Sequence, residues 1–567
     1  MPFAQSEFER DFADENALEP DSVTRFRGLL TRAADGPGLV VFEMDGARSA
    51  EAAAYGAAGR VVLNQSDLLV VVWDGIRESK PGGTEETLRQ AIAFHVPLLW
   101  IDALAPSHWT LLRSGDDLSG LAANDRYSPA AKPPLNSDGL QMTLAEAVAM
   151  VVTAELALPN SDPKDDPSQR DRARRFFQER RPLVNFGCLW KPFRDLIGSS
   201  GSGRFRRPEL TPPDFVQAIC GEWPVVGDPP SKHGQGSLSP APVASWTNAA
   251  LRHHYAWADG TADLSADAHR SGFVAGALLA AAAVFFALLP IAAAPYIGKI
   301  RSFEVGSIVM ELVIVMGLVG LVVGAHNGRW HQRWMEYRLL AELIRHLRFM
   351  IPLGGGRPLL RTPAHLKVYG DPSRSWMYWH LRAIARETGI SPTSATPSYL
   401  QERLDELAAM VGWPFGGQWR FHSDTENRNE TTHHRLHRAA VLLFGLTITG
   451  TVLHLGLLLA SQPIEAWAKQ FDGVLVLMSG FLPALGAALA SINNQGEFAR
   501  LAKRSRSMAD GFKGFGKEIG ALRDPPDPSK GLTLAAVTDV AGRISAMMVD
   551  EVMDWRVVVT DLPHSAG

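Results

Sequence analysis

Residues 272–298 read GFVAGALLAAAAVFFALLPIAAAPYIG and contain no charged side chain. At about 1.5 Å per residue, this segment is long enough to cross the ~30 Å hydrocarbon core of a bilayer. Three further apolar blocks follow along the chain, at 305–325, 439–464 and 473–496. Helices of soluble proteins rarely carry about eighteen consecutive apolar residues, so four such blocks predict four transmembrane helices rather than four buried core helices.

The four blocks fall into two pairs. The connections within the pairs, residues 299–304 and 465–472, are too short to hold a domain, so each pair is expected to form a helical hairpin. Lysine and arginine are enriched in cytoplasmic segments, and here they gather outside the hairpins rather than in the short connections. The N-terminal sequence also lacks the basic and apolar regions of a signal peptide. Both termini and the segment 326–438 are therefore predicted to be cytoplasmic.

Two kinds of residue inside the predicted spans are candidates for function. Gly317, Gly320 and Gly324 recur on one helix face, and such spacing lets helices approach closely, either within the chain, which is the simpler explanation, or between copies. Glu311 and His454 are ionisable, and a charge inside a membrane is costly, so we take both as candidate functional residues. Glu311 lies about two turns into its span, which leaves a hydrated position near the interface open.

Composition limits the remaining possibilities. The 567 residues carry a net charge of −4, and 20% of them are charged, which gives no indication of a general nucleic-acid binder. The two cysteines, Cys188 and Cys220, lie in no cluster, so neither a disulfide framework nor a structural zinc site is expected. The basic run 170–181 fits either a solvated helix face or a contact with anionic lipid headgroups.

The N-terminal part has the pattern of an α/β domain. Short apolar segments at 38–44, 67–73 and 97–102 alternate with helical patterns at 49–62 and 85–95. This order predicts a parallel, Rossmann-like sheet, and the continuous apolar run 67–73 is expected to be covered on both faces.

Ligands of parallel sheets bind beyond the carboxyl ends of the strands. A Gly-Gly-Thr turn that opens a helix can direct backbone N–H groups at a phosphate, or it can be a tight turn in which the threonine caps the helix. Both alternatives stay open, and Glu85 and Glu86 would repel a phosphate. The candidate ligand-binding residues are Asp74, Gly75, Gly82, Gly83 and Thr84.

The stretches LNQSDLLVVVWDG (63–75) and KPGGTEETLRQAIAFHVPLLWID (80–102) resemble the SLOG superfamily, Rossmann-like domains that sense or cleave nucleotide-derived ligands. The resemblance covers about residues 1–110. Similar proteins are fused to transmembrane effector modules of bacterial conflict and anti-phage systems. The second half of this chain resembles those fusions at HRSGFV (269–274), RWMEYRLLAELIRHLRF (333–349) and LPALGAALASINNQGEFARLAKRS (482–505).

The chain departs from the family at two points. Phosphoribohydrolases of this superfamily carry a PGGxGTxxE loop with a catalytic glutamate, whereas Pro81-Gly82-Gly83 here runs directly into Thr84, and Thr87 stands at the third position after it. In similar proteins a first strand and a glycine-bearing loop precede the segment that MPFAQSEFERDF resembles, and this sequence begins without them. The first of these departures speaks against hydrolysis.

These observations predict a membrane-bound sensor–effector of the bacterial inner membrane. Its SLOG-like domain would bind a nucleotide-type small molecule, and its four-helix part would perturb the bilayer, as a homo-oligomer without nucleic-acid partner, metal or further cofactor. A membrane-tethered enzyme that cleaves a nucleotide or nucleoside conjugate is the alternative, but the sequence offers no nucleophile–base pair. A transporter ranks last, because Glu311 and His454 give little with which to build a pathway.

The expected fold is an α/β Rossmann-like N-terminal domain followed by an α-helical membrane domain. Aromatic residues at 330, 334 and 337 predict that the second span continues into the cytoplasm as a packed helix. The expected parts are a SLOG-like domain at 1–155, a partly helical connector at 156–270, a first hairpin with its cytoplasmic helix at 271–350, a helical segment at 351–438, a second hairpin at 439–496 and a C-terminal helical segment at 497–567.

Overall fold

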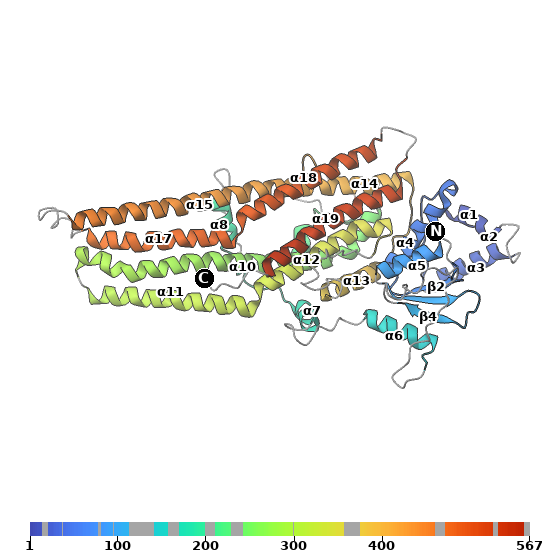
Figure 1. Ribbon diagram of the computed structural model, residues 1–567, viewed down its shortest axis with the longest axis horizontal. Coiled ribbons are helices and arrows are strands. Elements are labelled where there is room, and N and C mark those ends of the chain that lie inside the picture. The colour runs from blue at the N-terminus through green and yellow to red at the C-terminus, as the bar shows by residue number, and fades with distance from the viewer. Residues whose placement is uncertain are drawn as a thin grey trace.

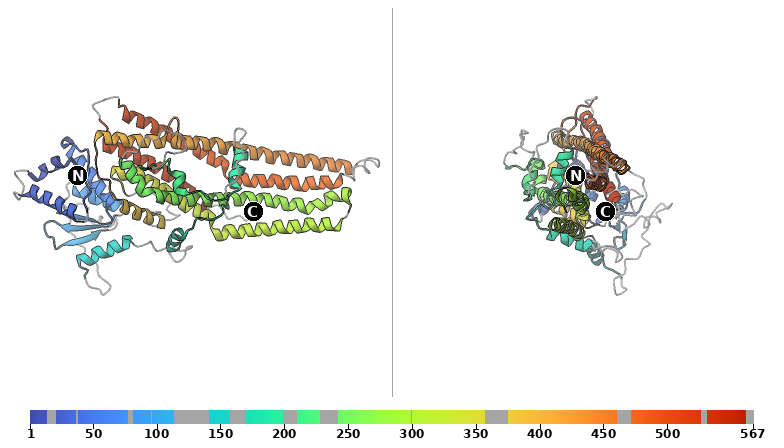
Figure 2. Two further views of the ribbon diagram at one scale, coloured as in Figure 1. Left: turned by 180° about the vertical axis from the view of Figure 1, so that it is seen from behind. Right: turned by 90° about the vertical axis from the view of Figure 1, so that its left-hand side faces the viewer.

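The computed structural model shows a mostly helical, elongated molecule with a small α/β domain at one end and long paired helices at the other (Figures 1 and 2). A helical stalk joins the two ends. The structure describes residues 1–13, 21–36, 38–76, 81–94, 96–112, 141–156, 169–198, 210–227, 242–298, 300–356, 375–459, 471–525 and 531–560.

Among the described residues, four helices contain segments that are long and apolar enough to cross a membrane, as the four predicted spans require. Most of each apolar segment is not buried within the molecule, as expected for surfaces that face lipid. Part of the second connection, 460–470, lies outside the described residues. The four helices are α10 (Pro242–Ile297), α11 (Arg301–Gly328), α15 (Gly417–Leu458) and α17 (Asp472–Gln495).

The four helices form an open row rather than a closed bundle. Helix α10 packs against α11 on one side and against α17 on the other, and α17 in turn packs against α15. Figure 1 shows this order from α15 at the top to α11 at the bottom, and Figure 2 shows it from behind. A single row of helices encloses no interior, so one copy of the chain has no room for an aqueous path.

The two hairpins repeat one structural device at the point where the chain leaves them. A single residue in the left-handed conformation follows the second helix of each hairpin, namely Arg329 (φ 45°) after α11 and Glu497 (φ 46°) after α17. An aromatic residue comes next, Trp330 or Phe498, and it fills the space where a Cβ on the preceding glycine would lie. In each hairpin the chain thus bends between the second membrane helix and the stalk helix that follows it, α12 or α18.

The stalk continues the membrane helices beyond their apolar segments. Helix α10 begins at Pro242, so residues 242–270, which the sequence assigned to the connector, are already part of the long helix. Trp334 and Tyr337 pack in the core of the stalk, which confirms the predicted packing helix after the second span. The other stalk elements are α7 (Gln169–Gln178), α8 (Trp190–Gly198), α9 (Phe215–Ile219), α12 (Trp330–Met350), η3 (Ile351–Leu353), α13 (Trp376–Thr388), α14 (Pro397–Val411), α18 (Phe498–Arg523) and α19 (Leu534–Thr560).

The N-terminal domain contains a three-stranded sheet in the order β2-β3-β4. Strands β2 (Leu69–Trp73) and β3 (Leu98–Asp102) are parallel, and β4 (Trp109–Leu112) is antiparallel to β3. Leu88 and Ile92 of α5 and Leu63 of α4 form the core with one face of the sheet. The remaining elements are α1 (Gln5–Phe8), α2 (Arg10–Ala13), α3 (Ser22–Asp35), η1 (Arg48–Ala50), α4 (Glu51–Gln65), α5 (Thr84–Ala93) and α6 (Leu144–Leu156).

This sheet differs from the predicted one in two respects. The first strand, β1 (Phe42–Glu43), does not join β2 but pairs in parallel with β5 (Thr393–Ser394), while the amino group of Met1 donates to the Phe42 carbonyl at 2.7 Å. Strand β2 is covered on one face only, since Val70 and Val72 are 53% and 62% exposed. The parallel pair joined by α5 is present, but the continuous βαβαβ sheet is not.

Candidate functional site

The first part of the candidate ligand site is the turn after β2. Gly75 is buried and has a positive φ of 77°, which favours glycine. The Asp74 carboxylate accepts a hydrogen bond from the Ile76 N–H at 3.0 Å, so one of its oxygens stabilises the turn itself. Asp74 and Gly75 therefore lie beyond the carboxyl end of β2, as the sequence predicted.

The second part is the turn that opens α5. Gly82 has a φ of 77°, and a Cβ there would lie 1.9 Å from the Ala52 carbonyl oxygen of α4. The Gly82 N–H donates to the Glu86 carboxylate at 2.6 Å. Gly83, rather than Thr84, occupies the N-cap position, and it has no side chain with which to cap the helix. The close backbone approach at Gly82 is thus made to α4, and its N–H is already used within the turn.

The turn before α5 can offer a ligand two helix N-termini and one hydroxyl group. The turn at Gly82 brings the N-terminal end of α5 beside the N-terminal end of α4, and the positive ends of two helix dipoles favour an anion. Thr84 is exposed at the first position of α5 and presents a hydroxyl group there. Glu51, Glu85 and Glu86 in the two first turns oppose a highly charged ligand. A ligand with few negative charges fits this edge better than a polyphosphate.

One further residue at this edge was not predicted from the sequence. Asp102 ends β3, lies beside Trp73 in the sheet register and is buried. Its carboxylate accepts from the Leu104 N–H at 2.9 Å. Asp74 and Asp102 thus occupy equivalent positions at the ends of neighbouring parallel strands. Within the described ranges, no group of three or more His, Cys, Asp or Glu side chains is placed to hold a metal ion.

An ion-pair cluster fastens the N-terminal domain to the stalk. Asp67, just before β2, pairs with Arg386 of α13 through two hydrogen bonds of 2.5 and 2.8 Å and with Arg382 at 2.9 Å. Burial alone would raise the pKa of the Asp67 carboxyl, but the hydrogen bonds from Arg386 and Arg382 outweigh it and hold this pKa below its ordinary value. The two partners lie more than 300 residues apart in sequence, so the pattern gave no sign of this clamp.

Asp67→Asn is expected to loosen the clamp by about 1–3 kcal/mol, because two guanidinium groups lose their charged acceptor. Hydrogen exchange of residues 61–73 and 376–388 in the full-length protein should rise. Since the folded-state pKa is depressed, the stabilisation is complete above the unfolded-state pKa of about 4 and is lost as the pH falls through the folded value. The matched control is Asp405→Asn, which breaks an exposed Asp–Arg pair; equal exchange in both variants would contradict the clamp.

The intramembrane candidates lie in three different settings. Glu311 follows Ser307 along the partly buried side of α11, and a Cβ added at Gly317, Gly320 or Gly324 would meet nothing within 4 Å. The expected packing of this glycine face within the chain is therefore wrong. His454 lies near the end of α15, where its Nε2 atom is 2.7 Å from the Asp472 carboxylate at the start of α17. His454 thus links the two helices of its hairpin at the end remote from the stalk.

A buried ionic cluster lies inside the stalk. Glu342 of α12 is 3% exposed and pairs with Arg338 at 2.6 Å and with Arg345 at 3.0 Å. Arg338 also contacts Asp259 of α10 at 2.6 Å, and Arg345 donates to the Tyr255 hydroxyl. The cluster adds charged contacts to the apolar core that α10 and α12 share, and it favours one register where the two helices run side by side.

No family model, curated protein or solved structure matches the chain. Its function must therefore be inferred from its own residues and contacts.

Proposed function

We propose that the protein is a membrane-bound sensor–effector whose N-terminal domain binds a nucleotide-derived small molecule and whose membrane helices then perturb the bilayer. The resemblance of residues 63–102 to SLOG domains supports the class of ligand, and it suggests a role in bacterial anti-phage defence. The gathering of lysine and arginine outside the hairpins supports placing the stalk and both termini in the cytoplasm.

The observation that carries the proposal is the position of α4. This helix contacts both the candidate ligand turn and the helical path α11–α12–η3, here called the rod, which leads to the membrane. Near its start, Ala52 and Gly56 pack against Gly82. Near its end, Val61 contacts the Cα region of Gly354, the residue that follows α12 and η3. A ligand that displaces the turn at Gly82 would therefore move α4 against the end of this rod.

The rod itself reaches the far end of the molecule. Helices α11 and α12, joined by the bend at Arg329, together with η3 form a helical path of 53 residues from Arg301 to Leu353. At about 1.5 Å per residue this path is roughly 80 Å long, so it connects the N-terminal domain to the outer edge of the membrane row. Rigid helices of this kind transmit a shift at one end as a tilt or translation at the other.

The membrane step requires more than one copy of the chain. The row of four helices has no interior, and the glycine face of α11, formed by Gly317, Gly320 and Gly324, is open. Small residues on an open face allow the close helix contacts through which membrane proteins associate. We therefore place the contact between copies at this edge of the row.

Titration calorimetry with the full-length protein in detergent tests the sensing step. Nucleoside monophosphates, cyclic mononucleotides and cyclic dinucleotides are the probes, and at least one should bind. Thr84→Val should weaken that binding about tenfold, because it removes a hydroxyl but keeps the shape of the side chain. Thr31→Val on α3 serves as the matched control.

Binding of no nucleotide would overturn the sensing step. Equal binding by the Thr84→Val and Thr31→Val variants would place the ligand elsewhere than at α5. Turnover of a bound nucleotide would instead favour the membrane-tethered enzyme.

A further inference from the structure

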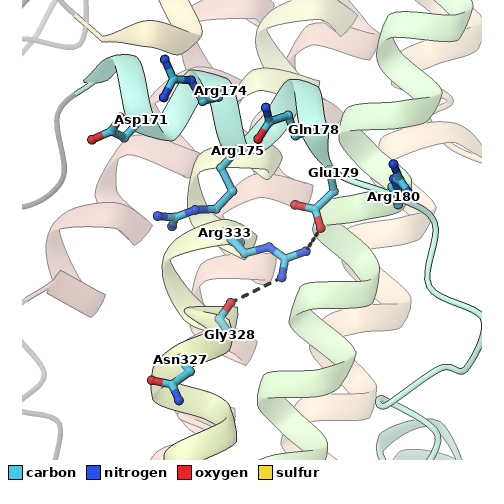
Figure 3. Close-up of a pocket in the computed structure, with 9 residues that line it drawn as sticks. All are labelled: Asp171, Arg174, Arg175, Gln178, Glu179, Arg180, Asn327, Gly328 and Arg333. Atoms are coloured by element: carbon cyan, nitrogen blue, oxygen red, sulfur yellow. Dashed lines mark hydrogen bonds and ion pairs between the residues drawn. The ribbon is translucent and has the colours of Figure 1, made fainter.

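An open cavity of about 410 Å³ lies outside the candidate site, where α7 crosses the junction of α11 and α12 (Figure 3). In Figure 3, Arg175 and Glu179 extend from the α7 segment toward this junction, and Arg333 of α12 bonds both Glu179 and the Gly328 carbonyl. We call this cavity the collar pocket. It is lined by Asp171, Arg174, Arg175, Gln178, Glu179, Arg180, Asn327, Gly328 and Arg333.

The collar pocket is strongly basic. Four arginines and two carboxylates line it. One arginine, Arg333, is neutralised by Glu179. Arg174, Arg175 and Arg180 have no carboxylate partner among the residues that the structure describes. Guanidinium groups without internal partners favour an external anion, and a phosphate can accept two parallel hydrogen bonds from one guanidinium group.

The pocket lies at the level where the apolar segments of the first hairpin end. Its floor is Asn327 and Gly328, the last two residues of α11. On α10, the Ser271 hydroxyl accepts from the Trp190 N–H at 2.9 Å, and the charge-free apolar segment begins at the next residue, Gly272. The chain between α7 and α8 is thereby fixed at the membrane boundary on both helices.

The same segment exposes large apolar side chains. Leu183 is 91% exposed and Phe186 is 69% exposed, and Leu196, which lies in α8 itself, is also 69% exposed. Such residues are unfavourable in water but are stabilised in the boundary layer between headgroups and acyl chains. The arginines and the apolar residues together match a membrane surface. A soluble phosphate would contact the arginines only and would leave the apolar residues exposed to water.

We propose that the collar pocket binds the phosphate of an anionic phospholipid headgroup, while the apolar residues between α7 and α8 dip into the adjoining lipid. A bound lipid would join α7 to the bend at Arg329 and fix the depth of the hairpin in the bilayer. The inference depends on the membrane-spanning helices and not on nucleotide sensing.

Energy transfer from tryptophan to a dansyl-labelled lipid tests the inference on the full-length protein in detergent micelles. Wild type should prefer dansyl-phosphatidylglycerol over dansyl-phosphatidylcholine by about tenfold or more, and salt should reduce the preference. The variant R174Q/R175Q/R180Q should lose most of it. The matched control R32Q/K513Q/K517Q removes the same charge from exposed sites on α3 and α18, and it should keep the preference.

Two results would overturn the inference. One is equal binding of the two lipids by wild type, or equal loss in the triple variant and its control. The other is displacement of the labelled lipid by glycerol phosphate at concentrations similar to that of the lipid, which would make a soluble phosphate the ligand. Because the three arginines pair with no described residue, the triple variant should unfold at the same temperature as wild type, so a loss of lipid preference reports binding.

Discussion

Glu342→Ala should destabilise the stalk by about 3–5 kcal/mol, the range for breaking a buried ion pair. The carboxylate lies between Arg338 and Arg345, and its removal takes the closest carboxylate from the buried Arg345 and leaves Arg338 with Asp259 alone. Glu342→Gln keeps a side-chain oxygen that accepts hydrogen bonds but loses the negative charge. Its stability should therefore lie between those of wild type and Glu342→Ala. The midpoint of chemical denaturation in mild detergent measures the loss, and hydrogen exchange over 335–350 locates it.

An exposed ion pair provides the comparison for this variant. Glu518 on α18 pairs with Arg543 on α19, and both side chains are well exposed. Glu518→Ala should therefore cost at most about 1 kcal/mol. If Glu342→Ala and Glu518→Ala shift the midpoint equally, the buried cluster does not hold α10 and α12 together.

Gly82→Val is expected to disrupt the N-terminal domain by about 3 kcal/mol or more. The new Cβ would lie 1.9 Å from the Ala52 carbonyl oxygen, and a β-branched residue is strained at a φ of 77°. The α4 backbone cannot easily shift, because α4 contacts Gly354 through Val61 and the sheet core through Leu63. Hydrogen exchange of α4 and α5 should rise toward that of the unfolded chain.

Gly28→Ala is the matched control, because a Cβ at Gly28 meets nothing within 4 Å and the residue lies inside helix α3. That change should be neutral or slightly stabilising. If the amides of α4 and α5 exchange as slowly in Gly82→Val as in wild type, Gly82 does not lie close to the Ala52 carbonyl. Since Gly82→Val disturbs the fold itself, loss of nucleotide binding in this variant would say nothing about the ligand.

The membrane helices could be predicted from sequence because lipid imposes a local rule. A span must be predominantly apolar over a fixed length, and the segment 272–298 meets this rule without reference to any other part of the chain. The stalk obeys no such rule. Residues 242–270 mix alanine with polar and charged side chains, and they are helical because Tyr255 and Asp259 have partners on α12. Such partners cannot be read from a single segment.

The candidate site residues follow β2 and open α5, but the glycines among them were open to two interpretations. A glycine needed for close backbone approach looks the same in sequence whether it faces a phosphate or another helix. The structure shows that Gly82 faces α4. The strand at 38–44 was also identified, but its partner, Thr393–Ser394, lies some 350 residues away in the sequence.

Dye release from liposomes that carry the purified protein tests the central claim most directly. With a nucleotide that binds in calorimetry, wild type should release dye faster than without it. Asp67→Asn should uncouple release from the nucleotide, and Gly320→Leu should reduce release by blocking contact between copies. Release that is absent in both conditions, or equal with and without nucleotide, would contradict the sensor–effector account.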